Sequence, residues 1–423
     1  MNFIHSTISY LNKKGFFDLL VAKFLIQFIG FGTILFVTKF LAPEEIGQIK
    51  IIQSYAHVFA IVAGFGFNTA VLKICSERSS AEAKQKTLNI SFKLSLGTSL
   101  TTYFLLCLLI SNGYIASSPK LARWLIVYCT IIPVLVATDI LVVFLQSQKK
   151  IKLMARIQAF IKIQSAIFIV TSSWIWGFEG FIFSTIFAYV LGLAPLLWEV
   201  GFVFLRHPVS LPSSRLLKYA VLSMSANLVS QIGQRGDFFI LDHLMKDRAA
   251  IGYYSLATIF LLAATQVTGA VQQIITPYFS ENANNAVWIQ SNLKQTIRRM
   301  LLLSIATAIS VYVAAFCVIY LFLGASYNPT LDYLPALLLQ YIIFSSYAII
   351  GGALVGLGFM GFNFLVGLLS TPLSLLIAYW GLQHYGLNGV AWSKVISTFF
   401  TACLSYAALF YLLNKHYKKD DSR

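Results

Sequence analysis

Long apolar segments alternate with short polar connections over almost the whole chain. Twelve segments hold the roughly 20 mostly apolar residues that a helix needs to cross a bilayer. They cover residues 16–40, 47–72, 89–112, 121–146, 156–176, 179–205, 216–241, 251–275, 300–323, 333–357, 361–382 and 388–413. The pattern predicts an all-α polytopic membrane protein with twelve transmembrane helices and no appended soluble domain.

Two short motifs recur in the second half of the chain. An Ile-Gly pair ends at Gly47 and again at Gly252, 205 residues later, and a Gly-x-x-Gly motif ends at Gly180 and again at Gly389, 209 residues later. These offsets favour a repeat of six spans, although glycine-rich helix starts could also coincide by chance. Because six is even, the repeat predicts two six-helix bundles related by a pseudo-twofold axis along the membrane normal. The predicted bundles cover residues 1–210 and 211–423.

The seventh predicted span is more polar than a lipid-facing helix. Ser223, Asn227, Gln231 and Arg235 recur every four residues, which places them along one helix face. An arginine at membrane depth is costly unless it faces water, protein or a ligand. We therefore expect this face to line a cavity.

Polar stripes also occur on spans one, two and eight, and the repeat makes spans one and two equivalent to spans seven and eight. The stripe residues are Lys23 and Gln27; Gln53, His57, Gly64 and Asn68; and Ser255, Thr258, Thr265, Gly269, Gln272 and Thr276. Hydrogen bonds between helices would explain any one stripe. Stripes on four equivalent helices favour a shared water-filled cavity.

Basic residues outnumber acidic ones, with a net charge of +16 on a chain that is only 11% charged. In a membrane protein such an excess first reports topology, and no nucleic-acid-binding pattern accompanies it. With a cytoplasmic N-terminus, twenty Lys and Arg residues flank the inner side and five flank the outer side. The outer five are Lys39, Lys120, Arg123, Lys246 and Arg248. This asymmetry predicts that both termini are cytoplasmic.

A further six basic residues lie inside spans or near their ends. They are Lys23, Lys50, Lys93, Lys162, Arg235 and Lys394. Lys50 and Lys93, near span ends, are expected to snorkel toward the interface. A cavity with excess positive charge suits an anionic ligand, and the planar guanidinium of Arg235 suits phosphate.

Three residues are candidates for ion coupling, namely His57, Asp139 and Asp237. Histidine can titrate near neutral pH, although a hydrogen-bonded packing role is the alternative. Asp237 and Arg235 are two positions apart, so on an ideal helix they point about 200° away from each other. Asp237 is therefore expected to pair with a neighbouring helix or to stay solvated near the outer surface.

No catalytic constellation is present in the sequence, which lacks a Walker loop, a G-x-S-x-G motif and an H-E-x-x-H motif. The five cysteines are scattered without a CxxC pair. We therefore expect no enzyme, no cofactor and no metal site. Energy for transport would come from an ion gradient, from substrate and product gradients, or from a partner.

Two stretches near the start of each half resemble a known family. The first combines Phe40-Leu-Ala-Pro-Glu-Glu-Ile-Gly-Gln-Ile-Lys with Ala63-Gly-Phe-Gly-Phe-Asn-Thr-Ala70. The second combines Asp237-Phe-Phe-Ile-Leu with Ile251-Gly-Tyr-Tyr-Ser-Leu-Ala257. With the twelve spans, these motifs resemble O-antigen flippases (Wzx-type), polysaccharide transporters of the multidrug/oligosaccharidyl-lipid/polysaccharide (MOP) exporter superfamily.

This resemblance implies a MATE-like fold of two six-helix bundles that works by alternating access. It implies transport of an undecaprenyl-diphosphate-linked oligosaccharide, such as a lipopolysaccharide O-antigen unit, across a bacterial inner membrane, with a polysaccharide polymerase and a chain-length regulator as partners. By analogy, Lys23 and Arg235 would attract the diphosphate. The groups that could contact sugar hydroxyls are Gln27, Gln53, Asn227 and Gln231.

Two other functions stay open on the sequence alone. A multidrug antiporter of the same superfamily would favour acidic cavity groups, because its ligands are often cations. A membrane-bound polysaccharide polymerase or ligase would need a large periplasmic loop with arginines and histidines, whereas the predicted outer loops are short.

Overall fold

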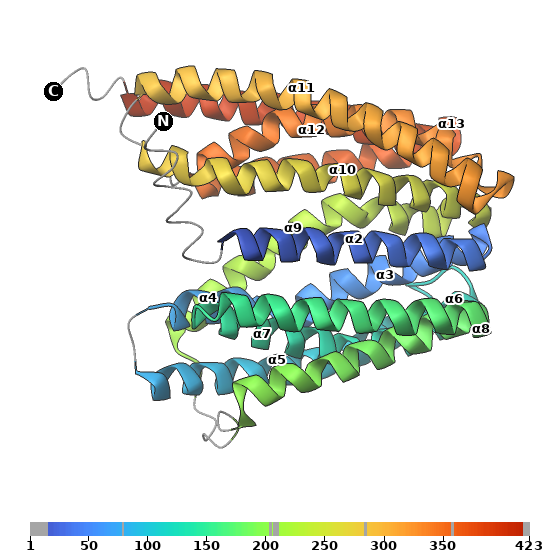
Figure 1. Ribbon diagram of the computed structural model, residues 1–423, viewed down its shortest axis with the longest axis horizontal. Helices are drawn as coiled ribbons and strands as arrows, with labels where there is room; N and C mark the ends of the chain where they lie inside the picture. The colour runs from blue at the N-terminus through green and yellow to red at the C-terminus, as the bar shows by residue number, and fades with distance from the viewer. Residues whose placement is uncertain are drawn as a thin grey trace. The chain divides into compact units, whose positions relative to one another are not determined.

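The computed structural model describes residues 16–77, 80–202, 205, 211–282, 286–356 and 359–417. Helices follow one another along this part of the chain, and each predicted span falls on helix (Figure 1). They are α2 (Phe16–Phe40), α3 (Pro43–Gly64), α4 (Phe67–Cys75), α5 (Ala81–Ser111), α6 (Pro119–Cys129), α7 (Ile132–Ser147), α8 (Ile151–Val200), α9 (Ser214–Leu244), α10 (Arg248–Glu281), α11 (Ala286–Val318), the π-helix η2 (Ile319–Leu323), the 3₁₀-helix η3 (Ala325–Tyr327), α12 (Thr330–Gly356) and α13 (Met360–Tyr417).

Two of the predicted spans are broken into two helices. Span two divides into α3 and α4 at Phe65 and Gly66, whose φ angles of 49° and 70° are left-handed. Gly66 suits such a conformation because it lacks a Cβ atom, and a Cβ there would also clash with the backbone of Ala220. Span four divides into α6 and α7 just before Pro133, which has no N–H to donate to the preceding turn.

The long helices α8 and α13 each contain two spans joined at a glycine kink. Gly177 in α8 has φ 59° and ψ −136°, and Gly386 in α13 has φ 61° and ψ −149°. These glycines are the first residues of the repeated Gly-x-x-Gly motif, 209 positions apart. The repeated motif therefore folds into the same turn twice, which supports the predicted internal repeat.

The helices form two compact units. The first unit comprises Met1–Ala42 and Ile51–Leu228, and the second comprises Pro43–Lys50 and Val229–Arg423. The first turns of α3 thus belong to the second unit, and α9 contributes to both. Within the second unit α10, α11, α12 and α13 pack side by side (Figure 1). The boundary at residue 210, drawn from the repeat, stays a prediction about the bundles.

The starts of α3 and α10 pack closely against each other in the second unit. A Cβ on Gly252 would clash with the backbone of Pro43, and a Cβ on Gly47 would approach the backbone of Arg248 and Gly252. The two contacts are reciprocal, because Pro43 and Arg248 are also 205 positions apart. Small residues allow backbones to approach in this way.

Eight segments of the described residues are long and apolar enough to cross a membrane, including most of α8 and α13. The chain is accordingly a multi-pass membrane protein. Helix α9 is not among these segments, since it is the least hydrophobic of the long helices. Its polar face is the reason.

Candidate functional site

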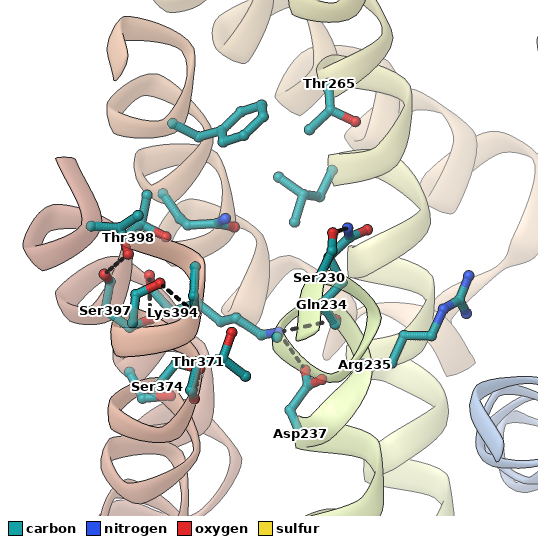
Figure 2. A pocket seen from close by; sticks show the side chains of 18 of the residues that line it. Ser230, Gln234, Arg235, Asp237, Thr265, Thr371, Ser374, Lys394, Ser397 and Thr398 are labelled. Atoms are coloured by element: carbon teal, nitrogen blue, oxygen red, sulfur yellow. Dashed lines mark hydrogen bonds and ion pairs between the residues drawn. The ribbon is translucent and has the colours of Figure 1, made fainter. Parts of the chain in front are cut away.

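A cavity of about 600 Å³ lies within the second unit. Its walls come from the start of α3, the second half of α9, and α10, α12 and α13 (Figure 2). This volume is typical of ligand sites. The cavity is described below from its charged floor to its hydroxyl-lined wall.

Three basic groups and one carboxylate line the cavity, namely Lys50, Arg235, Lys394 and Asp237. They come from three helices, because α3 supplies Lys50, α9 supplies Arg235 and Asp237, and α13 supplies Lys394. The formal charge of this set is therefore positive. Such a lining attracts anions and disfavours cationic ligands.

Asp237 is the buried centre of the charged set, with only 3% of its surface exposed. Its Oδ2 atom accepts a hydrogen bond from the Tyr254 hydroxyl at 2.7 Å and lies 3.1 Å from the Nζ atom of Lys394. The same Nζ donates to the backbone carbonyl of Gln234 at 3.4 Å. Asp237 therefore pairs with neighbouring helices, as the helical geometry predicted.

Arg235 points away from Asp237 (Figure 2). Its Nε atom donates to Oε1 of Gln231 at 2.9 Å, one turn earlier in α9. The four-residue spacing of the polar stripe thus orients the guanidinium. Lys50 was expected to snorkel, but its Nζ instead lies 5.6 Å from the ring centroid of Phe238 and lines the same cavity.

The opposite wall is lined by serine and threonine residues of α13 that the sequence reasoning missed. They are Ser370, Thr371, Ser374, Ser393, Ser397, Thr398, Thr401 and Ser405. The sequence does hold a signal for them, since residues 393, 397, 401 and 405 recur every four positions. The search for stripes followed only spans one, two, seven and eight.

Asn227 belongs to a hydrogen-bonded chain in the first unit. Its amide donates to Oγ of Ser223 at 3.2 Å, and Ser223 in turn donates to Oγ1 of Thr69 at 2.7 Å. The first part of the α9 stripe is therefore tied to α4, which lies in the same unit.

The remaining predicted residues also belong to the first unit. Gln53 is half-buried on α3, while Gln27 on α2, His57 on α3 and Asp139 on α7 are exposed. Lys23 lies in α2, but its side chain is outside the described part of the structure. The assignment of these residues to substrate binding or ion coupling stays a prediction.

Solved transporter structures share this fold. A lipid II flippase MurJ in an inward closed conformation has a TM-score of 0.78 at 16% identity, covering 93% of this chain and 87% of that one. An inward-facing multidrug resistance MATE family transporter of the MOP superfamily has a TM-score of 0.74 at 12% identity, covering 92% and 95%. A mutant of a Vibrio cholerae MATE transporter has a TM-score of 0.63 at 14% identity, covering 97% and 98%. The predicted MATE-like fold is confirmed.

The family follows from the sequence match. The model of the polysaccharide biosynthesis protein family matches residues 36–332, so the chain belongs to this family. No curated protein matches the chain. The predicted relationship to polysaccharide exporters of the MOP superfamily is thereby confirmed.

Proposed function

We propose that this protein is a flippase for lipid-linked oligosaccharides. It moves undecaprenyl-diphosphate-linked O-antigen, or a related surface polysaccharide unit, from the cytoplasmic to the periplasmic leaflet by alternating access. The main support is the cavity of the second unit, in a member of the polysaccharide biosynthesis family, with three basic groups and a hydroxyl-rich wall. The lipid II flippase in the comparison supports the view that this fold can accommodate a lipid-linked substrate.

The physical problem of flipping explains the need for such a cavity. A diphosphate cannot cross hydrocarbon unaided, because the cost of removing its hydration is prohibitive. Since Lys394 is paired with Asp237, Lys50 and Arg235 supply the positive charge that offsets the diphosphate. We assign the same attraction to Lys23, and contacts with sugar hydroxyls to Gln27, Gln53, Asn227 and Gln231.

Deletion of the gene tests this function. The cell is expected to lose its surface polysaccharide and to accumulate the lipid-linked unit in the cytoplasmic leaflet, and a plasmid copy is expected to reverse both effects. A drug exporter of the same superfamily would instead leave the polysaccharide intact and raise sensitivity to cationic drugs. That pattern would contradict the flippase proposal.

The charge asymmetry of the loops also predicts the topology. Both termini are expected on the cytoplasmic side of a bacterial inner membrane, where the polymerase and chain-length regulator would act on the opposite side as partners. Single cysteines at residues 2 and 422 are expected to resist an impermeant thiol reagent in intact cells, and to react after permeabilisation. A cysteine at Lys246 in the outer connection is the matched control, which should react in intact cells.

A further inference from the structure

The cavity wall of α13 and the end of α11's partner helix region around Thr371 present hydrogen-bond acceptors. Thr371 donates its hydroxyl to the carbonyl of Val229 at 3.4 Å, Ser374 to that of Thr371 at 2.7 Å, and Ser397 to that of Lys394 at 3.2 Å. Ser393, Thr401 and Ser405 likewise donate to backbone carbonyls of the preceding turn. A hydroxyl has one hydrogen and two lone pairs, so these oxygens can only accept from the cavity.

Two further acceptors line the same cavity. Oδ1 of Asp237 and Oε1 of Gln340 are buried and have no hydrogen-bond partner among the described residues. Buried polar atoms are normally paired. The cavity is thus rich in acceptors around one carboxylate, a setting that calls for a cation.

Lys394 supplies that cation from within the chain. Its Nζ has three hydrogens and no acceptor, and it lies 3.1 Å from Oδ2 of Asp237 and 3.4 Å from the carbonyl of Gln234. Figure 2 shows the side chain extending from α13 across the cavity to α9. Its ammonium therefore occupies the position that a small monovalent cation would take beside a carboxylate and a carbonyl.

We propose that Lys394 is a resident cation of this site, which makes an exchangeable cation at Asp237 unnecessary. An aspartate that couples transport to an ion gradient must bind and release its ion. Asp237 instead keeps a covalently tethered partner, and Lys50 and Arg235 in the same lining disfavour a second positive charge. Asp237 is then a positioning residue that holds α13 to α9. The inference concerns the cation site and does not depend on the identity of the substrate.

Thermal unfolding of the purified full-length protein in detergent tests the inference. The melting temperature is measured between 0 and 200 mM sodium, lithium or methylammonium chloride, with choline chloride keeping the ionic strength constant. The wild type is expected to show no dependence on the cation. Lys394→Ala opens the site, so its melting temperature is expected to rise by on the order of 3 °C with at least one of these cations.

Two controls separate a specific site from a general salt effect. In the double variant Lys394→Ala with Asp237→Asn, the carboxylate is gone and the rise is expected to disappear. Lys162→Ala removes a half-buried lysine of α8 in the first unit, whose Nζ packs against Gly30, and should confer no cation dependence.

The proposal is overturned if the wild type itself gains stability from one of these cations and Asp237→Asn abolishes that gain. It is also overturned if Lys394→Ala folds and responds to none of them. The wild-type measurement decides the matter even if Lys394→Ala fails to fold. None of these outcomes depends on transport, so they are distinguishable from failure of the proposed flippase function.

Discussion

Replacing Gly252 by alanine is expected to destabilise the second unit severely. The added Cβ would overlap the backbone of Pro43 where α10 meets α3, and backbone atoms cannot rotate away as a flexible side chain can. Overpacking typically costs about 1–3 kcal/mol, and a clash with backbone belongs at or above the upper end of that range. The measurement is the melting temperature in detergent, together with the yield of monodisperse protein.

Gly269→Ala in the same helix is the matched control. No atom lies within 4 Å of the Cβ that this substitution would add. Alanine in a helix interior is more favourable than glycine by about 0.5–1 kcal/mol, so this variant is expected to match or exceed the stability of the wild type. Equal melting temperatures for Gly252→Ala and Gly269→Ala would contradict the close packing of α3 against α10.

Removal of the guanidinium in Arg235→Ala is expected to abolish most surface polysaccharide while leaving protein levels near normal. Charge-assisted hydrogen bonds contribute about 1.5–3 kcal/mol each, so losing one or two predicts a fall in translocation of at least about tenfold. Arg235→Lys keeps the charge but loses the two-pronged geometry, and an intermediate effect is expected. The readout is polysaccharide quantity in a deletion strain carrying each variant.

Arg215→Ala is the control on the same helix. Arg215 is exposed and bonds Glu77 through its two terminal nitrogens at 2.5 and 2.9 Å. Exposed ion pairs contribute about 0–1 kcal/mol, so this variant should support normal polysaccharide levels. If Arg235→Ala and Arg215→Ala behave alike, the diphosphate does not depend on Arg235 and the site assignment is wrong.

Hydropathy predicted the spans well because length and apolar content alone decide whether a helix can cross a bilayer. The breaks within spans were harder to predict. A left-handed residue at Phe65 has no sequence signature of its own, since the adjacent Gly66 could equally sit in a regular helix. The kinks at Gly177 and Gly386 were marked by the repeated motif, although hydropathy alone shows only two apolar segments on either side.

The candidate site was predicted in part. Four-residue spacing correctly marked Gln231 and Arg235 as neighbours on one face, because that relation is local to one helix. The partners of Asp237 were not identifiable, since Tyr254 and Lys394 reach it from other helices and only tertiary packing brings them together. Lys50 was assigned to the interface for the same reason, as its position near a span end says nothing about the neighbouring helix.

Translocation by the purified protein in proteoliposomes tests the central proposal most directly. Undecaprenyl-diphosphate-linked oligosaccharide is placed in both leaflets, and a membrane-impermeant glycosidase is added outside. With wild-type protein the whole pool is expected to be cleaved, whereas protein-free vesicles and vesicles with Arg235→Ala should retain the inner-leaflet half over the same time. Protection of that half in wild-type vesicles, with the protein folded and inserted, would contradict the flippase function.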